Sequence, residues 1–104
     1  MSELARIPVA SVPEGKALRL PGGPDGVCLV RLGEKFYAVA DRCTHADVRL
    51  SEGEVDEFDC SIECWKHGST FSLLDGHPQS LPATVAVAVY AVRVEGPEVV
   101  VSDQ

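Results

Sequence analysis

The sequence lacks several features that common classes of protein need. No stretch approaches the ~18 to 20 consecutive apolar residues of a membrane-spanning helix. Residues 1–6 contain no apolar run of the kind found in a signal peptide. No amphipathic helix pattern, internal repeat or linker is present. These absences argue against a secreted or membrane protein, and we expect a soluble protein of the cytoplasm.

Basic residues and histidines are also scarce. Nine Lys and Arg residues stand against sixteen Asp and Glu residues, which gives a formal net charge of −7. This charge disfavours nucleic acid and anionic membranes and favours basic protein partners, although acidity also simply keeps a small domain soluble. Of three histidines, only His77 lies outside the motifs described below. A catalytic iron site with two histidines and one carboxylate therefore cannot be built from this chain.

The pattern of turns predicts an all-β fold. A chain of 104 residues forms one domain with a modest core. Short apolar stretches separated by Gly and Pro predict strands at residues 5–9, 16–20, 27–32, 36–40, 71–74, 85–94 and 99–101. Residues 33–35 and 95–98 have the spacing of hairpin turns. Residues 54–58 are acidic and are expected to form a surface excursion. We therefore expect an antiparallel sandwich or barrel.

Four cysteines, Cys28, Cys43, Cys60 and Cys64, could form two disulfides in a secreted protein. Because no secretory signal is recognised, thiols that bind a metal are the better interpretation. Cys28 lies in an apolar run and is expected in the core, and Cys60 is expected as a partly buried thiol on a strand. His77 follows a turn signal and is expected to face solvent.

Two short motifs each pair one cysteine with one histidine. They are Cys43-Thr44-His45 and Cys64-Trp65-Lys66-His67, separated by eighteen residues. Each motif places both candidate ligands within a single tight turn, on a loop that follows a strand. Four such ligands can hold one tetrahedral zinc ion or one two-iron cluster. The first metal would make the protein a structural or interaction module, and the second would make it an electron carrier.

The spacing C-x-H-x18-C-x2-H resembles the motif of Rieske [2Fe–2S] proteins. Flanking residues agree, with Asp41-Arg42 before the first motif and Gly68-Ser69 after the second, and the resemblance extends over residues 12–96. It is strongest to the small Rieske ferredoxins that serve aromatic-ring-hydroxylating dioxygenases. The resemblance implies a Rieske-type antiparallel β-sandwich formed by residues 1–104. Within it, an inserted cluster-binding subdomain is expected at about residues 42–81, with the loop around Pro82 covering one side of the cluster.

The same resemblance implies the ligands and the role. Cys43 and Cys64 would bind one iron as thiolates, and His45 and His67 would bind the other as neutral imidazoles. The protein would then be a monomeric carrier and not an enzyme, passing single electrons from an NAD(P)H-dependent flavin reductase to a terminal oxygenase. Two alternatives remain open: a Rieske ferredoxin that serves iron–sulfur assembly or another redox system, and a non-redox zinc-binding interaction module.

Several positions depart from the wider family. Val48 and Lys66 stand where Rieske proteins of respiratory and photosynthetic complexes carry disulfide-forming cysteines, so that disulfide cannot form. Ser69 could donate a hydrogen bond to a cluster sulfur, but Phe71 replaces a tyrosine with the same role. Fewer such donors stabilise the reduced state less, so we expect a potential of about −150 to 0 mV. Trp65, where many members have proline, is either an aromatic docking contact or a lid over the cluster.

Overall fold

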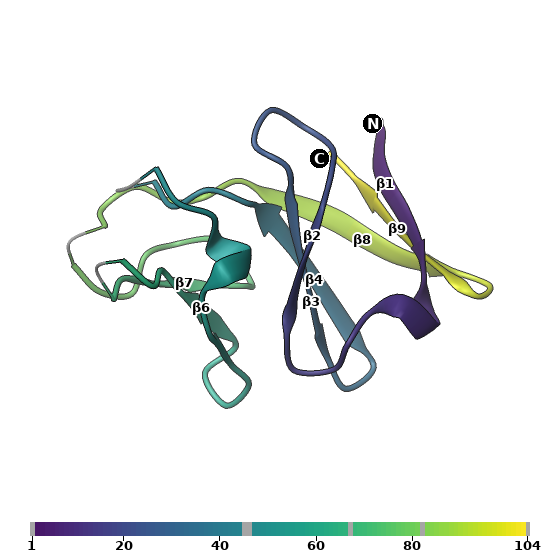
Figure 1. Ribbon diagram of the computed structural model, residues 1–104, viewed down its shortest axis with the longest axis horizontal. Coiled ribbons are helices and arrows are strands. Elements are labelled where there is room, and N and C mark those ends of the chain that lie inside the picture. Colours follow the sequence, from purple (N-terminus) through teal and green to yellow (C-terminus); the bar gives the residue numbers. More distant parts are fainter. Residues whose placement is uncertain (1, 45–46, 67, 82, 104) are drawn as a thin grey trace.

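The computed structural model describes residues 2–44, 47–66, 68–81 and 83–103. Within these residues the protein is all-β, with antiparallel strand pairs in two sheets and no α-helix (Figure 1). The larger sheet has the order β1-β9-β8-β4-β3-β2. Its strands are β1 (Glu3–Pro8), β2 (Ala17–Leu20), β3 (Val27–Leu32), β4 (Lys35–Ala40), β8 (Val89–Glu95) and β9 (Glu98–Ser102). The all-β prediction is confirmed.

The smaller sheet and two short 3-10 helices complete the described elements. The small sheet has the order β5-β6-β7, and its strands are β5 (Val55–Asp56), β6 (Ser61–Glu63) and β7 (Thr70–Ser72). The 3-10 helices are η1 (Val9–Ser11) and η2 (Leu50–Glu52). The small sheet and η2 are inserted in the chain between β4 and β8. They lie together at one end of the molecule, beside the larger sheet (Figure 1).

The larger sheet curls so that its two ends enclose a core. Strand β8 pairs with β9 over five residue pairs and with β4 over only two, so β8 joins the two halves. Val99 and Val101 of β9 pack in one apolar cluster with Leu29 of β3 and Ala38 of β4. We call this cluster the sandwich core. Within the described residues, no helix has the length and hydrophobicity that a membrane crossing requires.

Strand β3 is buried on both faces. Val27 and Leu29 point into the sandwich core, whereas Cys28 and Val30 belong to a second cluster on the opposite face. All four side chains are fully buried. Successive strand residues face opposite sides of a sheet, so β3 supplies both clusters by simple alternation. The prediction that Cys28 lies in the core is confirmed.

The second cluster is covered by the small sheet and the loops around it, and we call it the insert core. Its other buried residues come from β4 and from the insert, and they are Val39, Cys43, Leu50, Ile62, Cys64, Phe71, Leu73, Ala83 and Val87. Both predicted cysteine ligands therefore lie within this core. The large sheet serves as the base on which the two cysteine loops are packed.

Two predicted strands are too long. Strand β7 ends at Ser72, so the predicted strand 71–74 extends two residues too far. Strand β8 begins at Val89, so residues 85–88 of the predicted strand 85–94 form a loop. Their backbone groups bond to another loop and to the end of β4: the Val87 amide donates to the Gly76 carbonyl at 2.9 Å, and the Ala88 carbonyl accepts from the Ala40 amide at 2.9 Å. Gly76 allows this approach, because a Cβ there would lie 2.2 Å from the Val87 carbonyl oxygen. The apolar composition of this stretch reflects loop packing as well as strand formation.

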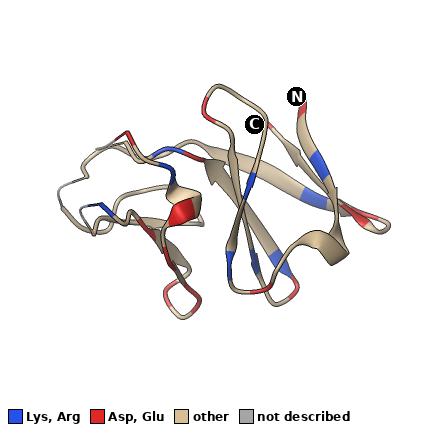
Figure 2. Cartoon of the chain, viewed as in Figure 1, with Lys and Arg blue, Asp and Glu red and all other residues tan. Residues whose placement is uncertain are grey.

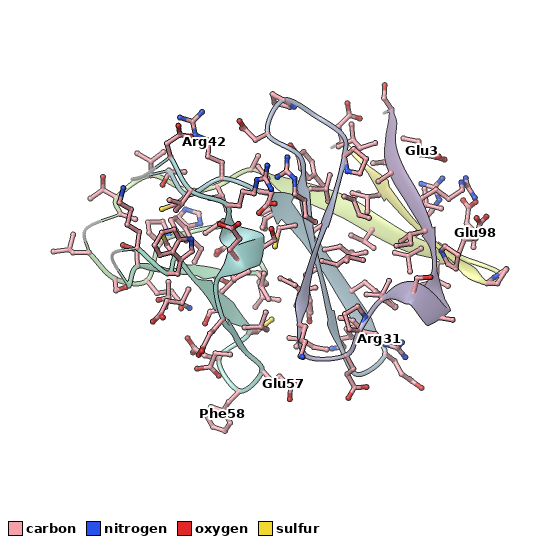
Figure 3. All side chains as sticks on the ribbon, in the orientation of Figure 1. Glu3, Arg31, Arg42, Glu57, Phe58 and Glu98 are labelled. Carbon is pink, nitrogen blue, oxygen red and sulfur yellow. The ribbon has the colours of Figure 1, made fainter. Side chains whose placement is uncertain are left out.

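The acidic surface excursion predicted at residues 54–58 contains a short strand. Val55 of β5 pairs with Ile62 of β6, and the turn between the two strands exposes Phe58 completely (Figure 3). Cys60 is partly buried as expected, but it lies in this turn with a φ of 52° and not on a strand. Burial, followed by interaction with Cys60, raises the pKa of Tyr37 on β4.

Candidate metal centre

Three loops of the insert meet at the candidate metal centre. The first loop comprises residues 41–49, the second residues 64–69 and the third residues 81–88. The Thr44 hydroxyl of the first loop donates to the Val85 carbonyl at 2.6 Å. The Ala83 amide of the third loop donates to the Ser69 hydroxyl of the second at 3.1 Å. Because Ala83 and Val85 are only two residues apart, the third loop holds the first and second loops near each other.

Each predicted cysteine ligand sits in a tight backbone turn. The Cys43 amide donates to the Val48 carbonyl at 3.0 Å. The Cys64 amide donates to the Ser69 carbonyl at 2.7 Å, and the Gly68 amide donates back to the Cys64 carbonyl at 2.9 Å. Gly68 has a φ of 75°, a left-handed conformation that glycine adopts without steric cost. Gly68 therefore permits the sharp turn that follows the second motif.

Both cysteines are buried, at 2% exposure for Cys43 and 0% for Cys64. A thiolate that is surrounded by apolar side chains is unstable unless a cation or a metal compensates its charge. The pair therefore fits a metal or an iron–sulfur cluster, and it also fits two protonated thiols in an apolar core. Their shared position, each in a turn of adjoining loops, favours a site that is shaped around a bound group.

The other titratable candidates are not part of this arrangement. Burial, and then the nearby charge of Asp41, raises the pKa of the Cys28 thiol well above its ordinary value, so Cys28 stays protonated in the core. The side chain of His77 is 73% exposed and lies 3.3 Å from the Asp75 carboxylate. The prediction of a solvent-facing His77 is therefore confirmed. Cys28, Cys60 and Cys64 carry free thiols, so the two-disulfide alternative does not occur.

The two predicted histidine ligands, His45 and His67, lie outside the described residues, as does Pro82. Among the residues that are described, no group of three His, Cys, Asp or Glu side chains is placed to hold a metal ion. The set of four ligands therefore stays a prediction, of which the structure describes the two cysteine members.

Ser69 and Phe71 occupy the positions expected to face the cluster sulfurs. Ser69 is fully buried, and its hydroxyl accepts a hydrogen bond from Ala83. A serine hydroxyl can accept one bond and donate another, so its proton can still serve a buried acceptor. Phe71 is also fully buried but has no polar atom to donate. Of these two residues, only Ser69 could donate a hydrogen bond to a cluster sulfur.

Sequence reasoning missed a buried carboxylate at the base of the first loop. Asp41 is 1% exposed and forms an ion pair of 2.8 Å with Arg19 of β2. It also accepts hydrogen bonds from Ser51. In the sequence, Asp41 was recognised only as a residue that flanks the first motif. Its partners lie 22 and 10 residues away, so no local pattern could have indicated the contact.

The rim of the three loops exposes apolar side chains. Trp65 of the second loop is 54% exposed, and Leu81 and Val85 of the third loop are 78% and 60% exposed. Arg42, at the same end of the molecule (Figure 3), lies 3.5 Å from the Asp47 carboxylate. The exposure of Trp65 suits a docking contact better than a lid, since a lid would bury most of the ring.

Comparison with known proteins gives concordant results. A family model described as the Rieske [2Fe-2S] domain matches residues 3–91. The ferredoxin subunit of 3-phenylpropionate/cinnamic acid dioxygenase from Escherichia coli (strain K12) is 40% identical over 99 residues, covering 95% of this chain and 92% of that protein. The protein of that name from Shigella flexneri serotype 5b (strain 8401) matches with the same identity and coverage.

Solved structures agree in fold. The ferredoxin of carbazole 1,9a-dioxygenase from Nocardioides aromaticivorans IC177 has a TM-score of 0.93 and 28% identity, with all of both chains covered. A chain in a solved complex of reduced oxygenase and oxidized ferredoxin in carbazole 1,9a-dioxygenase has a TM-score of 0.86 and 35% identity. That match covers 99% of this chain and 93% of the other. The expected sandwich with an insert is therefore the fold that this chain shares with these proteins.

Proposed function

Because the chain belongs to the Rieske [2Fe–2S] domain family, whose model matches residues 3–91, we propose that it is a ferredoxin, an electron carrier and not an enzyme. Its partners would be a flavin-dependent, NAD(P)H-oxidising reductase and the terminal oxygenase of an aromatic-ring-hydroxylating dioxygenase. The names of the similar proteins support this role, since they are ferredoxin subunits of dioxygenases. We further propose that the protein acts as a monomer in the cytoplasm.

The observation that carries the proposal is the pair of buried cysteines on adjoining loops. Cys43 and Cys64 would hold one iron, and His45 and His67 would hold the other, within a cluster-binding subdomain at residues 42–81. When bound, a [2Fe–2S] cluster accepts and releases one electron at a time. Ser69 would donate its hydroxyl proton toward a cluster sulfur, and burial of both cysteines would keep water from the thiolates.

The exposed rim of the loops supports a docking role. Trp65, Leu81 and Val85 present apolar surface around the centre, and large aromatic side chains often supply much of the binding energy of protein interfaces. A partner that covers this rim would also exclude water from the path of the electron. The rim therefore fits the contact with the terminal oxygenase.

The first experiment is the visible and EPR spectrum of the purified protein before and after dithionite. A red-brown protein that dithionite reduces to an EPR-active state with mixed nitrogen and sulfur ligation is expected. Cys64→Ser should lose this cluster, whereas the matched variant Cys60→Ser should keep it, because Cys60 lies in the turn before β6. A colourless protein with stoichiometric zinc and no iron, even after anaerobic preparation, would overturn the proposal.

Docking is tested separately with Trp65→Ala. We expect the second-order rate of electron transfer to a terminal oxygenase to fall about tenfold or more, as for loss of an interface hot spot of about 1.4 kcal/mol or more. Phe58→Ala is the control, since Phe58 is also an exposed aromatic residue but belongs to the β5–β6 hairpin. Equal rates for the two variants would contradict docking through the loop rim.

A further inference from the structure

Asp41 is a carboxylate in an unusual place. It follows the last residue of β4, lies two residues before Cys43, and is 1% exposed. Burial of a carboxylate costs several kcal/mol unless it is paired and hydrogen-bonded. A buried carboxylate is stable only when hydrogen bonds and an opposite charge compensate it. The residues that bond to Asp41 therefore show which segments it links.

Three hydrogen bonds satisfy this carboxylate. Oδ1 accepts from the Ser51 amide at 2.7 Å. Oδ2 accepts from the Ser51 hydroxyl at 2.7 Å and from Nη1 of Arg19 at 2.8 Å. Ser51 lies in η2, ten residues after Asp41, at the far end of the segment that carries Cys43. One side chain therefore closes the base of the first loop.

The large sheet anchors this closure. Arg19 lies on β2, and its Nη1 also donates to the Asp25 carbonyl at 3.3 Å. The guanidinium packs against Gly26, where a Cβ would come within 2.8 Å of its atoms. The Gly26 carbonyl in turn accepts from the Asp41 amide at 3.1 Å. Backbone and side chain of Asp41 are thus both fixed to the β2–β3 connection.

We propose that Asp41 is a positioning residue for the cluster: it holds the loop of Cys43 in the ligand geometry, while Arg19 neutralises its charge. The inference rests on the proposed function, because the cluster is what the loop would position. Asp41 and Arg19 together add no net charge near the first loop. Removal of either partner leaves a single charge there, next to a group whose own charge changes by one on reduction.

The two partners should therefore shift the reduction potential in opposite directions. Asp41→Asn leaves the cation of Arg19, which stabilises the more negative reduced state, so the potential should rise. Arg19→Met leaves the Asp41 carboxylate, which disfavours the added electron, so the potential should fall. The double variant should return toward the wild-type potential. A merely structural role predicts loss of stability in every variant without opposite shifts.

The test is a redox titration of the iron-loaded full chain and its variants at pH 8. Glu98→Gln is the matched control, because it also removes one negative charge, from an exposed pair with Arg6 on the opposite half of the molecule (Figure 3). It should leave the potential unchanged. Shifts of the same sign for the two single variants, or an Asp41→Asn shift no larger than that of Glu98→Gln, would overturn the proposal.

A second readout does not depend on the cluster. Amide hydrogen exchange at Ser51, measured in the protein without iron, should be faster in Asp41→Ala than in wild type, because alanine removes the carboxylate oxygen that accepts from this amide. Unchanged exchange would overturn the positioning role. If the wild-type protein binds no iron, the proposed function fails. The exchange measurement would still show whether Asp41 holds the Ser51 amide. If Asp41→Asn does not fold, Arg19→Met still tests the fall in potential.

Discussion

The two cores on either side of β3 are built in different ways. The sandwich core is enclosed by strands of four to seven residues that pair along most of their length. The insert core is covered by strands of two or three residues and by loops held through side chains such as Thr44 and Ser69. Long ladders make the first region self-supporting. The second depends on a few specific bonds and, we propose, on the bound cluster.

Charge is divided unevenly within the insert. Residues 52–63 contain six acidic side chains and no Lys or Arg, which leaves nine basic and ten acidic residues in the rest of the chain. Figure 2 shows this acidic stretch along the β5–β6 hairpin and η2. Arg42, Arg49 and Lys66 instead lie on the first and second loops. Most of the excess negative charge therefore lies on residues 52–63, and not on the rim around the candidate centre.

The largest effects should come from removing one large side chain from each core. Leu29→Ala in the sandwich core should lower the free energy of unfolding by about 2–5 kcal/mol, and Phe71→Ala in the insert core by about 3–5 kcal/mol. Circular dichroism follows mainly the large sheet, while fluorescence follows Trp65, the only tryptophan, which lies in the insert.

In Phe71→Ala without iron, the fluorescence transition should precede the circular dichroism transition on addition of denaturant. In Leu29→Ala the two transitions should coincide, because loss of the base sheet releases both regions. Coincident transitions in both variants would show that the two cores unfold as one unit, which would contradict the contrast drawn above.

A smaller effect is expected where η2 meets β6. Gly53 has a φ of −89°, so its backbone is open to any residue, but a Cβ there would lie 1.7 Å from the Glu63 carbonyl oxygen. Gly53→Ala must displace β6 immediately before Cys64, at a cost of about 1–3 kcal/mol in denaturant titration. Gly33→Asn, in the β3–β4 turn, is the control. No atom crowds that site, and Asn tolerates its φ of 63°, so a loss below about 1 kcal/mol is expected.

The smallest effect should come from the exposed ion pairs of the large sheet. Hydrogen bonding from Arg6 lowers the pKa of Glu3, and hydrogen bonding from Arg93 lowers the pKa of Glu95. The two ion pairs therefore stabilise the fold at pH values above the ordinary carboxyl pKa of about 4.3. This stabilisation is lost as the pH falls through the lowered pKa values. Arg6→Met should slightly reduce the dependence of the thermal midpoint on pH between pH 6 and pH 3. A steeper pH dependence than in wild type would contradict this assignment.

Sequence reasoning succeeded where the signal was local. The hairpin turns at Gly33 and Gly96 join strands as predicted, because short glycine-containing turns encode their own geometry. It failed at residues 85–88, whose apolar composition looks the same in a strand and in a buried loop. It also failed for β5, whose two residues are too few to show alternation. In both places the partner of the backbone decided the outcome.

The sequence by itself determined the chemistry that this protein can perform. We could recognise the two Cys–His motifs, their spacing and their family from the sequence, because ligand types and short spacings are properties of the chain. Only the tertiary structure decided how that chemistry is held. It buries Asp41 against Arg19 and Ser51, joins Thr44 and Ser69 through the third loop, and divides β3 between two cores. These are contacts between residues distant in the chain, and such contacts exist only after the backbone has closed around them.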